Sequence, residues 1–226
     1  MKAILNNIKP HIPSGIFIKD PESSALGKKI IQEGILLINE VGFEAFTFKK
    51  LGGKINSNES SIYRYFENKH KFLLYISSWY WSWMEYRLIF ETANISDAKE
   101  RLRKSIVLIT EETMDDMSTL HINESLLKQI IITDFTKTFL TKEVDEENRE
   151  GFFLIYKRVI HHIAGIIKEV IPEYPYPDSL SSAIVEGALH QHFLKQHLKT
   201  ITNCNDSVSP ADFYINMINS ILSNFI

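Results

Sequence analysis

The sequence of 226 residues contains a single cysteine, Cys204, which excludes a disulfide framework and a cysteine-based zinc site. We expect no signal peptide at the N-terminus, because Pro10 and Pro13 interrupt its short apolar stretch. HExxH, GxSxG and glycine-rich phosphate-binding motifs are missing too. The sequence therefore offers no nucleophile, base, metal site or cofactor motif, and it predicts a protein that is not an enzyme.

Long hydrophobic runs are also scarce, and the one segment that approaches a membrane span is residues 72–90, FLLYISSWYWSWMEYRLIF. Glu85 and Arg87 interrupt this segment and serines are spread through it, so a buried central helix is favoured over a span. We expect a cytoplasmic protein without a membrane partner.

Composition indicates an ordinary globular protein, with 44% hydrophobic and 23% charged residues and a net charge of −3. The charge is unevenly distributed, because residues 26–75 carry eight Lys and Arg against five Asp and Glu. A basic N-terminal part on an acidic remainder is typical of a protein that offers one face to DNA.

The stretch from Thr47 to Lys69, TFKKLGGKINSNESSIYRYFENK, predicts two short helices and the start of a third. Thr47, Asn58 and Asn68 are N-cap candidates, and Asn56 suits a left-handed backbone conformation in the turn between the first two helices. Helix, three-residue turn and helix is the layout of a helix-turn-helix DNA-binding motif.

Lysines stand where helix stability alone disfavours them. Lys49 and Lys50 follow the first cap, and Lys69 and Lys71 follow the third. The N-terminus of a helix carries partial positive charge, so each lysine there costs about 0.3–1 kcal/mol. A bound phosphate resolves the conflict, and this interpretation is favoured over solvated surface lysines.

Residues 26–75 resemble the DNA-binding domain of TetR/AcrR family regulators. Gly42, Phe43, Thr47, Leu51 and Ile62 match the family pattern, and YRYFENK at 63–69 is its most specific part. The resemblance implies phosphate contacts by Thr47, Lys49, Tyr63, Tyr65 and Lys69. The candidates to contact base edges are Glu59, Ser60, Ser61 and Arg64, and Asn58 belongs to the same DNA-binding surface.

Four residues depart from the family pattern. Gly52 and Gly53 lie inside a helix, Ser57 replaces an apolar residue, and Glu59 repels phosphate. They favour an alternative function, an adaptor with the same fold that acts through protein contacts without sequence-specific DNA binding.

The whole chain predicts an all-α protein of about nine helices. We expect an irregular N-terminal arm at 1–19, which either touches DNA or covers the core, a DNA-binding domain at 20–75, and a helical ligand-binding and dimerisation domain at 76–226. The expected helices are 20–42, 47–55, 58–66, 68–90, 96–117, 123–139, 141–171, 179–199 and 210–225.

The long helix from Asn68 carries many aromatic residues, which suit either core packing or a pocket for a small-molecule inducer of unknown identity. The pocket candidates are Trp79, Trp83, Tyr86 and Phe90. Acidic runs at 111–116 and 143–150 are interpreted as solvated faces rather than cation sites. Packing is also favoured over metal or proton sensing for His161, His162, His190, His192 and His197.

The last two helices present apolar faces that suit either the monomer core or a twofold dimer. The candidate dimer residues are Ile184, Gly187, Ala188, Met217, Ile221 and Phe225. One helix-turn-helix domain binds DNA weakly, whereas the two DNA-binding domains (heads) of a dimer can read two half-sites. This favours a homodimer on a palindromic double-stranded operator. The family resemblance implies a ligand-responsive regulator, most simply a repressor whose inducer shifts the lever helix 68–90.

Overall fold

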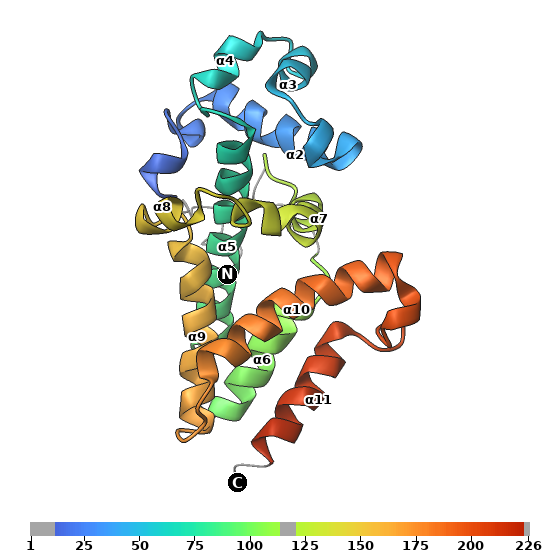
Figure 1. Ribbon diagram of the computed structural model, residues 1–226. Coiled ribbons are helices and arrows are strands. Elements are labelled where there is room, and N and C mark those ends of the chain that lie inside the picture. Colours follow the sequence, from blue (N-terminus) through green and yellow to red (C-terminus); the bar gives the residue numbers. More distant parts are fainter. Residues whose placement is uncertain (1–11, 114–120, 224–226) are drawn as a thin grey trace. The chain divides into compact units, whose positions relative to one another are not determined.

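The computed structural model describes residues 12–113 and 121–223, and every regular element in these ranges is a helix. Ten α-helices and four 3₁₀ helices are present there (Figure 1). The predicted all-α class is therefore confirmed. Within the same ranges, no helix combines the length and the apolar character needed to cross a bilayer.

The contacts divide the chain into two compact units. The first consists of Met1–Trp83 and Thr113–Leu154, and the second consists of Met84–Glu112 and Ile155–Ile226. The first unit thus includes residues 113–154, which the sequence assigned to a separate C-terminal domain. The functional division at residues 75 and 76 stays a prediction.

The first unit is built on a helix-turn-helix. Its elements are η1 (Ser14–Ile16), η2 (Pro21–Ser23), α2 (Ala25–Ala45), α3 (Phe48–Lys54), α4 (Glu59–Tyr63), the first part of α5 (Lys69–Thr92), α7 (Glu124–Asp134), η3 (Phe135–Thr138) and α8 (Val144–Arg149).

The three predicted caps are present in this unit. Thr47 accepts a hydrogen bond from the Lys50 N–H, Asn58 from the Ser61 N–H, and Asn68 from the Lys71 N–H. Asn56 has a φ of 55°, the left-handed conformation predicted for the turn. These local signals fix the start of each helix and the angle of the turn.

The core of the first unit is aromatic. The ring of Phe72 on α5 stacks on Phe46 at a centroid distance of 5.4 Å and meets Phe66 edge-on at 5.2 Å. Gly34 on α2 lets the ring of Phe72 approach, since a Cβ at residue 34 would lie 2.3 Å from it. Residues 72–84 are buried throughout, as expected of a central helix.

The N-terminal part begins differently from the expectation. Asp20 caps the 3₁₀ turn η2 and not an α-helix, and Ser24 caps α2 through the Gly27 N–H. The described part of the arm covers the core, because Ile12 and Ile16 are buried and the ring of Phe17 lies 6.0 Å from that of Tyr75.

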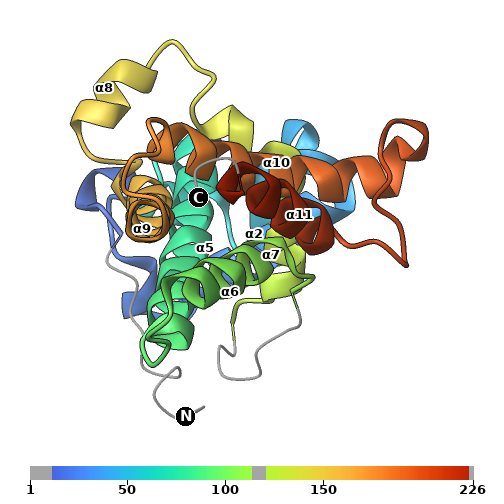
Figure 2. The same ribbon diagram turned by 90° about the horizontal axis from the view of Figure 1, so that it is seen from below.

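The second unit packs helices side by side. It contains the rest of α5, α6 (Ala98–Thr110), α9 (Leu154–Val170), α10 (Pro177–His197), η4 (Lys199–Ile201) and α11 (Pro210–Leu222). Helices α6, α10 and α11 contact one another pairwise, as Figure 2 shows. Gly187 on α10 allows the approach of α11, because a Cβ there would lie 2.1 Å from the Tyr214 hydroxyl.

Polar contacts also hold this unit together. Arg158 on α9 forms a two-pronged ion pair with Glu85, at 2.7 and 2.6 Å. The ring of His192 is buried and its Nε2 lies 2.7 Å from the Thr110 carbonyl, so packing accounts for His192. No group of three metal-ligating side chains occurs among the described residues. Burial also lowers the pKa of His162 and raises the pKa of Tyr214 to about 12.

Two of the predicted helices differ from those in the structure. The helix expected at 141–171 is interrupted between α8 and α9, because Gly151 has a φ of 82°. The helix expected at 96–117 begins after Asp97, which caps it, and ends at Thr110, since Glu111 is extended. Part of the acidic run, residues 114–116, and the predicted end at Met117 lie outside the described residues.

Candidate nucleic-acid interface

The side chains predicted to read bases lie on the short helix α4, and most of them are exposed. Glu59, Ser60 and Arg64 are exposed and Ser61 is half-buried. The Asn58 Oδ1 accepts from the Ser60 Oγ at 2.6 Å and from the Ser61 Oγ at 2.9 Å. Both hydroxyls are oriented by the cap, so their lone pairs remain free to accept from a base edge.

Three of the residues predicted to contact DNA phosphates are Thr47, Lys49 and Tyr63. Thr47 and Lys49 are exposed at the start of α3. Tyr63 is 47% exposed, and its ring meets Phe48 edge-on at 5.0 Å. This packing fixes the direction of the phenol while leaving much of it exposed, which suits a hydrogen-bond donor to phosphate.

Three of the four lysines that suggested phosphate have partners within the protein. Lys50 Nζ donates to the Ala45 carbonyl at 2.8 Å, and Lys69 Nζ donates to the Phe43 and Glu44 carbonyls at 3.1 and 3.0 Å. Lys71 lies over the Phe152 ring at 3.9 Å. The ammonium groups of Lys50 and Lys69 thus bind carbonyls of residues 43–45, the short turn that follows the non-helical Gly42 at the end of α2. The phosphate explanation is thus not required for Lys50, Lys69 and Lys71.

Lys137 of η3 binds the same end of α2. Its Nζ lies 2.7 Å from Glu44 and 2.8 Å from Asp134. The hydrogen bond from Lys137 holds the pKa of the exposed Glu44 below its ordinary value. This contact could not be predicted from the sequence, because residues 44 and 137 are far apart in the chain.

The environment of Tyr65 differs from the one that its predicted role requires. It was predicted to contact phosphate, but it is 4% exposed and its hydroxyl lies 2.8 Å from the Ser24 Oγ. The Tyr65 carbonyl accepts from the Ile18 N–H at 2.8 Å. The N-terminal segment covers Tyr65, so its side chain cannot reach DNA in this conformation.

The predicted pocket residues are distributed along α5. Trp79 and Trp83 are 5% and 9% exposed. Tyr86 and Phe90 are half-buried, and their rings stack at 6.0 Å with an interplanar angle of 10°. A ligand contact by these four side chains stays a prediction.

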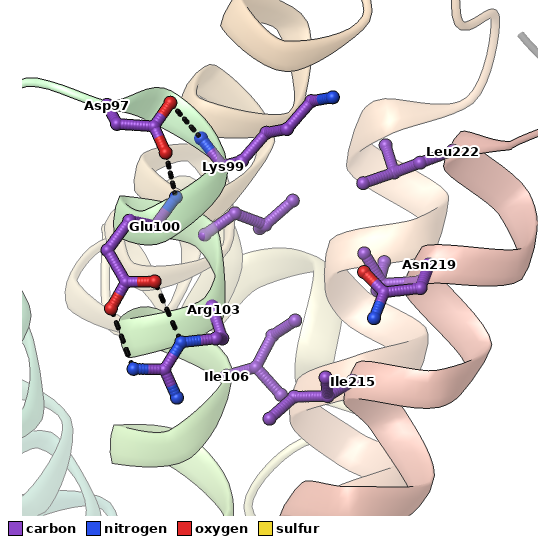
Figure 3. A pocket seen from close by; sticks show the side chains of 10 residues that line it. Asp97, Lys99, Glu100, Arg103, Ile106, Ile215, Asn219 and Leu222 are labelled. Atoms are coloured by element: carbon purple, nitrogen blue, oxygen red, sulfur yellow. Dashed lines mark hydrogen bonds and ion pairs between the residues drawn. The ribbon is translucent and has the colours of Figure 1, made fainter. Parts of the chain in front are cut away.

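A small pocket of about 160 Å³ lies between α6 and α11 (Figure 3). Ile106, Ile215 and Leu222 give it apolar walls. At its rim Glu100 binds Arg103 through two hydrogen bonds of 2.8 and 2.7 Å. This pocket could not be predicted from the sequence, since its two walls come from helices that are distant in the chain.

The predicted dimer residues have different environments. Ile184 and Ala188 are fully buried and Gly187 packs against Tyr214. Met217 and Ile221 are partly exposed and line a groove of about 380 Å³ on α11, with Phe213, Asn216 and Ser220. Phe225 lies outside the described residues. Phe213, which is 44% exposed, is an addition that the sequence analysis missed.

Residues 30–76 match the family model for bacterial regulatory proteins of the tetR family. Solved structures similar to this chain include AibR in complex with isovaleryl coenzyme A and operator DNA, with a TM-score of 0.54, 16% identity, and coverage of 84% of this chain and 97% of that chain. The TetR family transcriptional regulator PfmR from Thermus thermophilus has a TM-score of 0.56 and 14% identity, with coverage of 86% of this chain and 97% of that chain. The superantigen PfiT has a TM-score of 0.57 and 16% identity, with coverage of 92% of this chain and 98% of that chain. A comparison with curated proteins gives no match.

A helix-turn-helix with capped helices, on an all-helical fold similar to these structures, is the arrangement of a DNA-binding domain. Residues 30–76 carry the N-terminal domain of the tetR family, which confirms the predicted resemblance of residues 26–75 to the DNA-binding domain of that family.

Proposed function

We propose that this protein is a ligand-responsive transcriptional repressor that binds a palindromic operator as a homodimer in the cytoplasm. The observation that carries the proposal is the exposed polar surface of α4, held by the Asn58 cap within a domain that matches the TetR family. An exposed, oriented set of side chains on the second helix of the motif is what entry into the major groove requires.

In this proposal α4 reads base edges and α3 holds the backbone. Arg64 suits guanine, whereas Glu59 accepts from cytosine N4. Thr47, Lys49 and Tyr63 contact phosphates. The Lys69 ammonium spends two of its three donors on carbonyls of α2, and its third donor extends the phosphate contacts.

The ligand response has support from a protein of the same fold. The AibR structure contains both isovaleryl coenzyme A and operator DNA. By analogy, a small-molecule inducer of this protein favours a conformation that fits two half-sites poorly, so that operator affinity falls. The aromatic residues Trp79, Trp83, Tyr86 and Phe90 are the proposed inducer contacts.

Selection of bound sequences from a random duplex library, at two salt concentrations, tests the DNA-binding part. We expect a palindrome to be enriched, with affinity that falls steeply with salt. Tyr63→Phe should weaken operator binding by about tenfold or more, since a hydrogen bond to a charged group contributes about 1.5–3 kcal/mol.

The matched control for this measurement is Tyr176→Phe, which removes the hydroxyl of a tyrosine that is 64% exposed outside the motif. It should leave binding unchanged. Phenylalanine keeps the ring that packs on Phe48, so a loss in Tyr63→Phe reports the hydroxyl and not the fold. Absence of any enriched sequence at low salt would favour the adaptor.

The adaptor remains the second candidate because a superantigen, PfiT, has a similar fold, and one fold can serve different functions. Two departures that suggested it have structural explanations, however. Gly52 is required by the turn, since a Cβ there would lie 2.8 Å from the Ser57 carbonyl. Glu59 lies in the first turn of α4, where a carboxylate is favourable.

A further inference from the structure

The N-terminal segment 12–19 is fixed to the first unit by apolar contacts. Ile16 is 1% exposed and Ile12 is 8% exposed. The Phe17 ring meets Tyr75 on α5 edge-on at 6.0 Å. Because these side chains are buried, the residues that follow them, Ile18 and Lys19, have a defined position on the surface.

That position is beside the end of the recognition helix. The Ile18 N–H donates to the Tyr65 carbonyl at 2.8 Å, two residues after the last residue of α4. Lys19 Nζ lies over the Tyr65 ring, 5.2 Å from its centroid. In Figure 1 the dark blue N-terminal segment runs beside the loop that joins α4 to α5.

The contact places a positive charge where the sequence predicted a tyrosine hydroxyl. Tyr65 is 4% exposed and its hydroxyl is engaged with Ser24, whereas Lys19 is exposed. An aromatic face holds an ammonium group in place but does not neutralise it as a carboxylate would. The ammonium therefore keeps its charge and its hydrogen-bond donors for another partner.

The neighbouring carboxylates have partners of their own. Asp20 accepts from the Glu22 N–H at 2.9 Å, and Glu22 lies 2.8 Å from His121 Nε2. We propose that Lys19 binds the DNA backbone next to the half-site that α4 reads, and so takes the phosphate-contacting role that Tyr65 cannot fill. This proposal rests on the proposed function and adds a contact from outside the helix-turn-helix.

The expected effect follows from counterion release. Each phosphate that a basic side chain neutralises adds about −0.9 to the slope of log binding constant against log salt concentration. Loss of one contact should therefore reduce the magnitude of the slope by about 0.9 for each bound head, and weaken binding about eightfold per head at ~0.1 M salt.

The experiment is fluorescence anisotropy of the full chain on the duplex enriched by selection, between ~50 and ~200 mM salt. Lys19→Met keeps the apolar stem over the Tyr65 ring and removes the charge, and Lys19→Arg keeps the charge. Lys168→Met, at an exposed lysine of α9 in the second unit, is the matched control.

We expect Lys19→Met to bind more weakly with a shallower salt slope, and Lys19→Arg and Lys168→Met to behave as wild type. Thermal unfolding of each variant verifies that the fold is kept. A Lys19→Met protein that is folded and binds with the wild-type affinity and slope would overturn the Lys19 assignment alone. Wild-type protein that binds no duplex at low salt would instead overturn the proposed function, and the assignment with it.

Discussion

At the residue scale, two adjacent glycines in α3 look alike in sequence but have different structural roles. A Cβ at Gly52 would lie 2.8 Å from the Ser57 carbonyl and 3.2 Å from the Glu59 nitrogen. A Cβ at Gly53 would meet nothing within 4 Å. The first glycine permits the close approach of α3 to the turn, whereas the second only adds flexibility to a helix.

This difference predicts opposite effects of the same substitution. Gly53→Ala should raise the free energy of unfolding by about 0.5–1 kcal/mol, because alanine loses less conformational entropy in a helix. Gly52→Ala should lower it by about 1–3 kcal/mol, since the backbone of the turn must move. Urea unfolding of the two variants measures both effects, and a similar change in both would contradict the assigned roles.

Residue-level predictions succeeded where the signal was local. Thr47, Asn58 and Asn68 act on N–H groups three residues away, so their capping could be inferred from sequence. Tyr65 could not be placed in this way, because Ser24, its hydrogen-bond partner, is 41 residues distant. The carbonyl partners of Lys69 are likewise 25 and 26 residues away.

At the scale of elements, the approach of α10 to α11 depends on one small residue. Gly187 lies against Tyr214, and a Cβ at residue 187 would be 2.1 Å from the tyrosine hydroxyl and 3.1 Å from Cζ. Tyr214 is buried, so its ring has little room to move away.

We expect Gly187→Ala to destabilise the protein by about 1–3 kcal/mol through overpacking. Tyr214→Phe removes the oxygen that makes the worst contact, so Gly187→Ala should cost clearly less in the Tyr214→Phe background. A double-mutant cycle by chemical unfolding measures this coupling. Equal costs of Gly187→Ala in both backgrounds would mean that the helices are not held at this point.

Element boundaries were the weakest part of the sequence analysis. Periodicity alone predicted one helix through residues 141–171, where the structure has α8 and α9. Gly151, with its φ of 82°, was the available signal, because a left-handed glycine ends a helix. Most helices were predictable from their apolar patterns, but the division into α8 and α9 and the ends of the helices depended on such single residues.

At the scale of the whole molecule, the proposed homodimer needs a surface that the monomer leaves exposed. Ile184 and Ala188 are buried within one chain, so they do not supply it. The outer face of α11 does, because Phe213, Met217 and Ile221 follow the helical spacing and line one groove. Apolar side chains grouped on one face of a terminal helix are typical of a helix–helix interface.

This surface gives the last prediction. Met217→Glu and Ile221→Glu should each shift the protein from dimer to monomer in analytical ultracentrifugation, because a buried unpaired carboxylate opposes association. Leu154→Glu, at a residue 51% exposed at the start of α9, is the matched control and should remain dimeric. The monomeric variants should retain weak binding to a half-site and lose the tighter binding to the full palindrome, since two heads no longer act together. A dimer that persists in both variants, with wild-type operator affinity, would place the interface elsewhere.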